Sequence, residues 1–400
     1  MAKSSQVLNR VNISKDVSNV ISAIVRYRRH FHRYPEIQFQ EHKTAKFIED
    51  ELARFGLSPK RMVGTGVVAL LDSAKKGKTI MLRADMDALP IKEENSHDYV
   101  SKHPGTMHAC GHDAHMAILL GVAKILKRSG IPRGKVKFCF QPGEEGGDGA
   151  GKMVLAGVLK NPKVDFAFGM HVWSPLPVGE IAIIPGPVMA SVDEFAVRIL
   201  GSGGHAAYPH ASVDPVVCAC AIVLSLQTIV SRNVSPLSPA VLTVASIQAG
   251  TAFNIIPGEV VLKGTVRTFE KNVRKLIERR FREIIKDVAS AYGCKAEIEF
   301  IHKVPATVNH PEMSQFVWEV AEGVVGKGNV KRVDPTMGGE DFSRYANEVP
   351  AVFAFIGARN EAKGAYFPHH HPRFDIDEDA LPIGAELARQ VTIKYLENFK

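Results

Sequence analysis

The feature that most constrains this chain is an alternation of strand-like and helix-like segments through its first 185 residues. Short apolar runs suit buried strands, and segments with helical periodicity separate them. Such an alternation predicts an α/β sheet with helices on its faces, whose ligands bind at the loops that follow the strands. The expected strands are 67–71, 79–86, 135–140 and 164–172, and the expected helices are 37–55, 117–128 and 150–159.

A second pattern follows the proline-rich segment 174–188. Its order is strand, helix, strand, strand, helix, strand, which is typical of a ferredoxin-like unit. Asp214 and Pro215 predict the start of its first helix, because aspartate caps helices and proline fits their first turn. The expected strands are 194–201, 240–250, 258–270 and 295–301, and the expected helices are 212–232 and 271–293.

The first type of alternation then resumes to the end of the chain. A chain of 400 residues also exceeds what one hydrophobic core usually serves. We therefore predict a two-domain α/β protein, in which a larger split domain (1–186 and 302–400) contains an inserted βαββαβ domain (187–301).

The net charge of +8 would suit nucleic acid, an anionic membrane surface or small acidic substrates. The densest basic run, 26–33, has its apolar residues near helical spacing and is predicted to be the solvated face of a helix. No nucleic-acid-binding motif accompanies the charge, and no uninterrupted apolar run approaches the ~18 residues of a membrane span. We therefore expect neither a nucleic acid nor a membrane as partner.

The cysteine content also bears on the cellular compartment. The five cysteines are an odd number and lack the spacing of a disulfide framework, and residues 1–10 carry no long apolar run. These features predict a protein of the reducing cytoplasm without a signal peptide. Cys218 and Cys220 lie in an apolar helical run and are expected to be core residues.

The segment MHACGHDAHM concentrates histidines with a cysteine and an aspartate. Gly111 interrupts its helical pattern, so we expect a turn that leads into a helix whose apolar part begins at Ala117. In a turn, Cys110 and His112 could reach one ion, and a thiolate with an imidazole suits zinc or another late transition metal. The alternative is that Asp113 caps the helix while the histidines lie on a loop.

Carboxylates follow two of the expected strands. Glu144 and Glu145 are flanked by glycines, and because adjacent side chains diverge, one could bind a metal while the other serves as a base for a water molecule. The alternative is a solvated acidic turn. Asp85 and Asp87 are spaced to face one way from a strand end, where Asp87 could orient a ligating histidine.

Two further histidine features complete the pattern. His171 ends a strand, where a lone histidine is more often structural than a ligand. The consecutive His369, His370 and His371 could bind metal, although the residues alone do not choose among them. Each signal is weak singly, but all of them fall at strand-to-loop transitions of one α/β domain, and together they predict a metal centre there.

Nine segments of the chain resemble, in order and spacing, the amidohydrolase subgroup of the M20 metallopeptidase family. That subgroup includes hippurate hydrolase, N-acyl-amino-acid amidohydrolases, auxin-conjugate hydrolases and archaeal thermostable carboxypeptidases, and the likeness to the last is greatest. The segments are RRHFHRYPEIQFQE, RADMDALP, MHACGHDAHM, FQPGEEGGDGAGKM, GMHVW, GSGGHAAYPH, NIIPGEVVLKGTVRTF, MGGEDFSRY and HHHPRFDIDEDAL.

The resemblance implies a site for two divalent metal ions per subunit, Zn²⁺ or Mn²⁺, with Co²⁺ or Ni²⁺ also compatible. Glu144 matches the catalytic base, Asp87 matches an aspartate that supports the ligands, and Asp85 stands where related peptidases carry a histidine ligand. The implied ligands are Cys110, His112, Glu145, His171 and His370.

Two positions need comment. His370 is chosen because the family's ligand lies two residues before the position of Pro372, and the histidine tract leaves this choice open to a shift of one residue. Gly143 stands where the family often has alanine, a departure with little effect on the chemistry.

The resemblance further implies that the inserted domain is a dimerisation domain. His205 matches a histidine that reaches the reacting carbonyl from the partner subunit, Asn254 and Arg267 match positions that grip the substrate carboxylate, and Gly338 and Gly339 match a segment that lines the same pocket. From the residues alone, His205 could instead rigidify a glycine-rich turn, Arg267 could face outward from a strand, and Asn254 could turn the chain.

These matches predict a metal-dependent hydrolase of the amide bond in N-acyl amino acids or short peptides with a free carboxylate, acting as a homodimer or homotetramer. One alternative is a binding protein that keeps the fold without catalysis, against which the pair Glu144 and Glu145 argues. The other is a hydrolase with Cys110 as nucleophile, which would be indifferent to chelators. The acyl group, the amino acid and the metal used in the cell stay open.

Overall fold

The computed structural model describes residues 7–399. Residues 1–6, part of the segment in which we predict no signal peptide, and Lys400 lie outside the described residues. The described chain folds as two compact units. Unit 1 contains the residues up to Val188, Val308–Asp334 and the residues from Asp341 onward, and unit 2 contains Met189–Thr307 and Pro335–Glu340.

Unit 2 is longer than the predicted insertion of 187–301. Its last strand continues to Val304, beyond the predicted end at Ile301. It also includes Pro335–Glu340, because the N–H of Ala190 lies 3.1 Å from the carbonyl oxygen of Thr336 and 2.9 Å from that of Gly338. No local sequence signal marks this segment, since the contact joins residues far apart in the chain.

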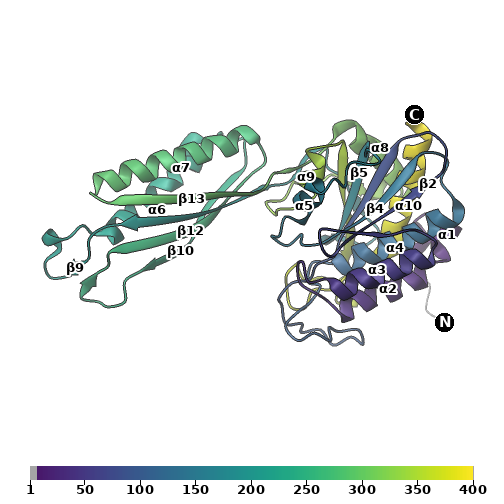
Figure 1. The fold of residues 1–400 in the computed structure, drawn as a ribbon, viewed down its shortest axis with the longest axis horizontal. Helices are drawn as coiled ribbons and strands as arrows, with labels where there is room; N and C mark the ends of the chain where they lie inside the picture. Colours follow the sequence, from purple (N-terminus) through teal and green to yellow (C-terminus); the bar gives the residue numbers. More distant parts are fainter. Residues whose placement is uncertain (1–6, 400) are drawn as a thin grey trace. The chain divides into compact units, whose positions relative to one another are not determined.

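Unit 1 is built on a mixed sheet, of which β2, β4 and β5 are labelled in Figure 1. Its strand order in the described part of the chain is β1-β2-β4-β3-β5-β16-β6-β15. Its strands are β1 (Lys60–Met62), β2 (Gly66–Asp72), β3 (Thr79–Asp85), β4 (Lys135–Gln141), β5 (Phe166–Pro177), β6 (Ile181–Ala182), β15 (Val330–Lys331) and β16 (Ala351–Arg359). Two more strands, β7 (Gly186–Met189) and β14 (Thr307–Asn309), pair with each other where the chain passes between the units.

The central strands explain the apolar runs in the sequence. β3 is parallel to both β4 and β5, and β5 is parallel to β16. Every residue of β3 is buried, because strands in the middle of such a sheet are covered on both faces and read as continuous apolar runs. The carboxyl ends of β3, β4 and β5 therefore lie at one edge of the sheet, where the predicted site residues follow.

Helices cover this sheet. α4 and α10 pack against β3, and α2 and α3 pack against α4. The helices of unit 1 are α1 (Lys15–Ser18), α2 (Ile21–Arg33), α3 (His42–Arg54), α4 (His112–Ser129), α5 (Gly149–Leu155), α8 (Pro311–Val325), α9 (Ser343–Ala346) and α10 (Ala380–Asn398), and short 3-10 turns lie at Leu8–Arg10, Lys327–Asn329 and Glu361–Lys363.

The start of α4 differs from expectation. The helix begins at His112, five residues before Ala117, and its N-cap is Gly111 with a φ of 90°. A Cβ at this position would lie 2.4 Å from Cγ2 of Val172, so only glycine fits both the left-handed backbone and the space. Asp113 does not cap the helix; its carboxylate bonds Arg28 and His32 of α2 instead.

The basic run in α2 was expected to be a solvated face, and this expectation is wrong for two residues. Arg28 and His32 are buried, with 1% and 0% of their surface exposed. Helical spacing places them on the face of α2 that contacts α4, where Asp113 compensates both charges. A burial of this kind depends on a carboxylate that is distant in sequence, so the local charge pattern could not reveal it.

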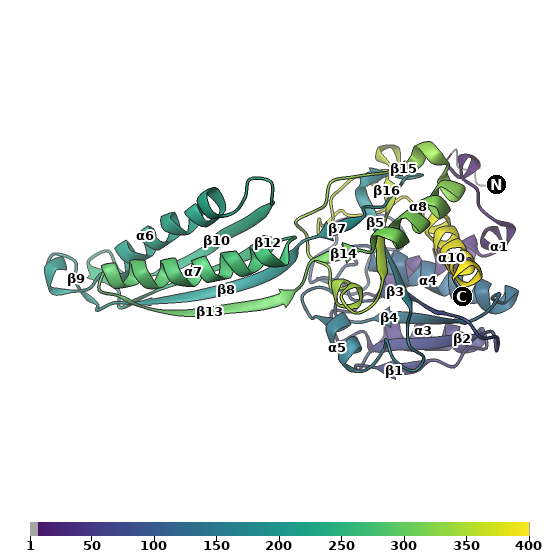
Figure 2. The same ribbon diagram turned by 90° about the horizontal axis from the view of Figure 1, so that it is seen from above.

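Unit 2 is a ferredoxin-like βαββαβ fold, as predicted. Its sheet has the strand order β10-β12-β8-β13 and is antiparallel throughout, and α6 and α7 lie side by side along one of its faces (Figure 2). The elements are β8 (Ser191–Leu200), α6 (Pro215–Thr228), β10 (Ala240–Ala249), β12 (Glu259–Thr268), α7 (Lys271–Ala291) and β13 (Lys295–Val304), with the small pair β9 (Gly204–His205) and β11 (Ile255–Ile256) and short turns at Pro209–Ala211 and Ile229–Asn233.

The helix α6 shows which local predictions hold. Asp214 caps it by accepting the N–H of Val216 at 2.8 Å. Cys218 is buried as expected, but Cys220 is exposed, because residues two apart on a helix point to different sides.

The stretch Pro215–Asn233 is long and apolar enough to cross a membrane by length and composition, and one third of it is buried. A helix that packs on a sheet can have the same length and composition, so this stretch is weak evidence for a membrane partner.

Candidate metal centre

The predicted metal-binding side chains of unit 1 come together at the carboxyl edge of β3, β4 and β5. Cys110 lies in the turn before α4, His112 is the first residue of α4, and His171 lies in β5. One ligand atom from each of these three residues lies within 4.8 Å of the others, and the distance from Sγ of Cys110 to Nε2 of His171 is 3.5 Å. This cluster therefore offers a thiol and two imidazoles to one ion, a donor set that suits zinc.

Backbone carbonyls fix which nitrogen each histidine offers. Nδ1 of His112 lies 2.8 Å from the carbonyl oxygen of Asp87, and Nδ1 of His171 lies 2.7 Å from that of Val172. A carbonyl can only accept, so Nδ1 carries a proton in each ring and Nε2 is the nitrogen left to bind an ion. Both Nε2 atoms are thus prepared as ligands by the groups behind them.

A second group shares Cys110 and adds Glu145 and His370. Oε1 of Glu145 lies 3.3 Å from Nε2 of His370 and 4.0 Å from Nε2 of His112. Among residues 7–399, neither Oε1 of Glu145 nor Nε2 of His112 has a hydrogen-bond partner, although both atoms are buried. A metal ion that binds the lone pairs of both atoms would account for these missing hydrogen bonds.

The three consecutive histidines differ sharply in their surroundings. His370 adopts a left-handed φ of 66° and is tied to Ala109 by a backbone hydrogen bond of 2.8 Å, beside Cys110. His369 instead accepts the N–H of Ser174 and packs between aromatic rings, and Nδ1 of His371 accepts the N–H of Arg373. In this geometry His370 is the member of the tract whose side chain faces Glu145, and it stays our predicted ligand.

Glu144 lies beside Glu145 but faces a different partner. Its Oε1 accepts the N–H of Asp341 at 3.3 Å, and one of its carboxylate oxygens lies within 4.8 Å of ligand atoms of His112 and Glu145. Its position next to the cluster, on a separate hydrogen bond, suits a base that acts on a molecule held there. The role of base stays a prediction.

Asp87 holds this loop. Its Oδ1 accepts the N–H of Glu144 at 3.0 Å and its Oδ2 accepts the N–H of Glu145 at 2.9 Å, while its own carbonyl orients His112. One buried residue thereby fixes both carboxylate-bearing residues and one imidazole. This arrangement agrees with the supporting role that the sequence suggested for Asp87.

We expect Asp87→Asn to weaken zinc binding by about 10- to 100-fold, as loss of a group that supports metal ligands typically does. Asparagine has one acceptor oxygen, so its NH₂ group would face one of the two N–H groups that the carboxylate now accepts. Competition with a chromogenic chelator would measure the affinity. Asp72→Asn is the control, because Asp72 is exposed at the end of β2. Equal affinities in the two variants would contradict this role.

Asp85 is buried in a network of its own. Its Oδ1 accepts from Nδ1 of His115 at 2.6 Å, and Arg83 donates to its Oδ2 at 2.8 Å. Burial alone would raise the pKa of Asp85, but Arg83, His112 and His115 hold it well below its usual value. The carboxylate is therefore ionised and lies 3.6 Å from Nε2 of His112, where it supports the cluster.

Sequence reasoning left His115 and Arg83 without a role. Nε2 of His115 accepts the N–H of Val172, and its Nδ1 bonds Asp85, so both of its nitrogens are engaged. His115 consequently positions Asp85 and packs 4.5 Å from the ring of His171. The spacing of His112 and His115 on one helix face was a usable signal for His115, whereas the bonds of Arg83 to Asp85 and Asp341 are visible only in the fold.

Protonation differs across the cluster. Burial alone would lower the pKa of His112, but Asp85 holds it well above its usual value, and Cys110 and Glu145 raise the pKa of His370 to about 10, so these two rings would give up a proton when an ion binds.

Burial lowers the pKa of His171 well below its usual value, and nearby His115 lowers it further, so the ring is neutral. Burial and the adjacent Glu145 raise the pKa of Cys110, so without a cation its thiol keeps its proton. The residues present thus fit a bound metal pair, because a thiol, imidazoles and a carboxylate converge there and a cation would make the thiolate stable.

The other predicted site residues belong to unit 2. His205 of β9 pairs with Ile255 of β11, its side chain is exposed, and the carbonyl of Asn254 accepts the N–H of Ala206 at 3.1 Å. Arg267 of β12 is half-buried and donates from Nε to Thr265 at 3.2 Å. These residues are therefore not part of the cluster within unit 1.

Two adjacent glycines of unit 2 differ in their surroundings, and one of them, Gly339, lies beside Arg267. A Cβ on Gly339 would lie 2.2 Å from Val192 and 3.3 Å from the guanidinium of Arg267, so a side chain there would displace both. Gly338 has more room, with 3.2 Å to the end of Met189. Gly339 is thus required for the packing of this strand end, whether or not a substrate binds near it.

Comparisons with known proteins agree with this geometry. The model of peptidase family M20/M25/M40 matches residues 81–394. Thermostable carboxypeptidase 1 of Saccharolobus solfataricus is 37% identical over 96% of this chain and 98% of its own length. An N-acyl-L-amino acid amidohydrolase of Geobacillus stearothermophilus is 45% identical over 76% of this chain and 83% of its own length. The solved structure of the Bacillus subtilis YXEP protein, a dinuclear metal-binding peptidase of the M20 family, has a TM-score of 0.83 at 33% identity and covers 96% of this chain and 100% of that one.

Proposed function

Because the chain belongs to peptidase family M20/M25/M40, we propose that it hydrolyses the amide bond of N-acyl amino acids or short peptides that carry a free carboxylate. The observation that carries this proposal is the cluster at the carboxyl edge of β3, β4 and β5. There a thiol, imidazoles and Glu145 converge, two buried atoms lack hydrogen bonds, and Glu144 lies alongside.

The proposed division of labour follows from the contacts. Cys110, His112, His171, Glu145 and His370 would hold two divalent ions, and Cys110 belongs to both groups of ligands. Such a pair would supply a polarised substrate carbonyl and would lower the pKa of the attacking water to roughly 7. The cysteine favours zinc, while manganese, cobalt or nickel could occupy the same donors according to availability.

The remaining chemistry falls to residues of the chain. Glu144 takes a proton from the attacking water and later delivers it to the leaving amine, and the N–H of Asp341 keeps its carboxylate in place. His205 of the partner subunit donates to the developing oxyanion, and Asn254 and Arg267 bind the substrate carboxylate. Arg267 suits that role because its guanidinium offers paired donors to a carboxylate.

A panel of N-acyl amino acids and dipeptides tests the activity. We expect zinc- or manganese-loaded protein to release amine from at least one member, and a chelator to abolish release until metal is added back. Absence of release with zinc, manganese, cobalt and nickel would overturn the proposal and favour a binding protein that keeps the fold. The substrates that are cleaved would also define the acyl and amino-acid preference.

The chelation experiment also addresses Cys110 as a nucleophile, which its raised thiol pKa already disfavours. If Cys110 is a metal ligand, Cys110→Ser loses metal together with turnover. If Cys110 is a nucleophile, the same variant keeps its metal and loses turnover alone. Metal content measured beside activity therefore separates the two mechanisms.

We also propose that unit 2 mediates a homodimer, which could pair further into a tetramer in the cytoplasm. Unit 2 exposes large apolar side chains, among them Phe253 at 100%, Leu224 at 72% and Tyr208 at 60%. Large apolar side chains exposed to this degree are what an association surface would cover. Light scattering during size-exclusion chromatography should give the mass of two or four chains, and the substitution Leu224→Glu should lower that mass. A monomeric wild type would contradict the proposal.

A further inference from the structure

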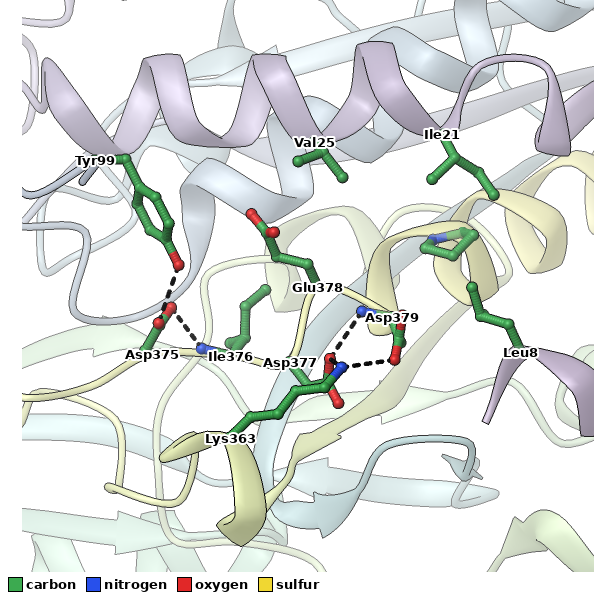
Figure 3. A pocket seen from close by; sticks show the side chains of 11 residues that line it. Leu8, Ile21, Val25, Tyr99, Lys363, Asp375, Ile376, Asp377, Glu378 and Asp379 are labelled. Carbon is green, nitrogen blue, oxygen red and sulfur yellow. Dashed lines mark hydrogen bonds and ion pairs between the residues drawn. The ribbon is translucent and has the colours of Figure 1, made fainter. Parts of the chain in front are cut away.

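A cavity of about 350 Å³ lies in unit 1 between α2 and the segment before α10. Figure 3 shows acidic side chains on its wall, and these are already engaged: Lys363 bonds Asp377 and Asp379, and Tyr99 donates to Oδ2 of Asp375 at 3.1 Å. The cavity itself therefore presents no free charge. Its wall at Asp375, however, continues into a second cluster of metal-ligating side chains.

This cluster draws on separate segments of unit 1. His32 comes from α2, and Glu93 and His97 come from the long loop between β3 and α4. One ligand atom of each lies within 4.8 Å of the other two. Asp375, from the segment that precedes α10, lies beside His97, with its Oδ2 at 3.8 Å from Nε2 of His97.

The distances resemble those between ligands that share an ion. Two ligand atoms at zinc-binding distance and tetrahedral angle are about 3.3 Å apart. Oε1 of Glu93 lies 3.1 Å from Nε2 of His32 and 3.4 Å from Nε2 of His97. Two nitrogens and one carboxylate oxygen would thus need only small shifts to bind one ion, and Oδ2 of Asp375 is near enough to His97 to move in as a fourth ligand.

His32 is already oriented for this task. Its Nδ1 lies 2.8 Å from Oδ2 of Asp113, and both side chains are buried. A carboxylate behind a histidine that points its other nitrogen at the site is the usual support for a metal ligand. Glu93 is held in the same way, because its Oε2 accepts the N–H of Ser101 at 2.7 Å and Oε1 faces the histidines.

Hydrogen bonds within the cluster do not account for the surroundings of His97. Among residues 7–399, both of its ring nitrogens are buried without a hydrogen-bond partner. Its ring stacks on Tyr99 at 3.7 Å, which fixes the ring plane. A protonated His32 that donates to Asp113 and Glu93 would satisfy those three residues and still leave both ring nitrogens of His97 without a hydrogen bond, whereas an ion would engage Nε2 of His97 together with His32 and Glu93.

Arg28 is the charge that would oppose a cation here. Its guanidinium is bound by Asp113, Asp375 and Glu378, of which Glu378 also binds Arg29 and Asp113 also binds His32. Counted with Glu93, the surroundings hold more negative than positive fixed charge. The balance therefore tolerates a divalent ion.

We propose that His32, Glu93, His97 and Asp375 bind one divalent transition-metal ion, of which zinc best fits the ligands, at a structural site distinct from the candidate catalytic pair. The site shares no ligand with the catalytic cluster. Closed sites of this kind stabilise a fold by joining distant segments. Here the ion would join α2, the loop before α4 and the segment before α10.

The test compares the zinc content of wild type, His97→Leu and His42→Leu after the full chain is stripped, loaded with zinc and freed of excess metal. His42 is an exposed histidine at the start of α3 and serves as the matched control. We expect His97→Leu to hold one ion per chain fewer than wild type and to keep its amine-releasing activity, while His42→Leu matches wild type. Glu93→Gln should show the same deficit.

The experiment tests the proposed function and the structural site independently of one another. Cys110→Ser probes the catalytic cluster alone, so its deficit should add to that of His97→Leu in the double variant. Equal zinc content in wild type, His97→Leu and Glu93→Gln would overturn the structural site and leave the proposed function intact. If either variant is unstable, anomalous scattering from a zinc-loaded wild-type crystal decides: a peak beside His97 supports the site, and none there refutes it.

Discussion

Replacing Glu144 with glutamine should lower kcat/KM by about 10²- to 10⁴-fold while the protein keeps its metal, because general-base catalysis is worth that much. Glutamine preserves the shape of the side chain and an oxygen that can accept the N–H of Asp341, which now bonds Oε1 at 3.3 Å. The backbone N–H of residue 144 would still donate to Asp87. The substitution thus removes the base and leaves the loop in place.

The neighbouring Glu145 provides the matched control. Oε1 of Glu145 faces Nε2 of His370 and of His112, so Glu145→Gln should lower zinc affinity as well as turnover. Steady-state kinetics on a substrate found by the panel, with metal content measured on the same samples, separates the two residues. Turnover of Glu144→Gln within tenfold of wild type would contradict its role as base. Metal loss in Glu144→Gln but not in Glu145→Gln would exchange the two roles.

The parts of the fold that local patterns control could be predicted from the sequence. Apolar runs located β3, β4 and β5, and the order βαββαβ located unit 2, because periodicity reflects which face of an element is buried. The same patterns placed chemical side chains at the strand ends. The structure brings Cys110, His112, His171, Glu145 and His370 together there, and it leaves their metal and catalytic roles as predictions.

What the sequence did not show depends on contacts between distant segments. The burial of Arg28 and His32 requires Asp113, which lies more than 80 residues away. The choice of His370 within its tract rests on a left-handed φ and a bond to Ala109, neither of which a run of three histidines encodes. The join of Pro335–Glu340 to unit 2 likewise depends on backbone bonds from Ala190.

The burial of Arg28 leads to the largest stability effect that we expect. Arg28→Met should reduce the free energy of unfolding by about 3–5 kcal/mol, the usual cost of removing one partner from a buried ion pair. Arg28 is 1% exposed, and it donates from Nε to Asp113 at 3.0 Å and from Nη1 to the hydroxyl of Tyr99 at 3.0 Å. Methionine fills similar space but leaves the buried carboxylates without their cation.

The pH dependence of this loss follows from Asp113. Burial would raise the pKa of Asp113, but Arg28 and then His32 hold it well below its usual value, so Asp113 stabilises the fold above about pH 4, its unfolded pKa. That contribution is lost as the pH falls through the lower, folded pKa. Without Arg28 the folded pKa of Asp113 rises. The difference between wild type and Arg28→Met should therefore be largest near pH 7 and shrink as the pH falls.

Arg29 offers a control one residue away on the same helix. It bonds Glu378 through two nitrogens at 2.9 and 2.7 Å, yet its side chain is 40% exposed, so Arg29→Met should cost no more than about 1 kcal/mol. Urea unfolding of the three proteins at pH 7 and pH 4.5 would measure both effects. Similar losses for Arg28→Met and Arg29→Met would show that burial of the ion pair does not decide the stability of this helix. If the free energy of unfolding that Arg28→Met loses did not depend on pH, Asp113 would not be the cause of the loss.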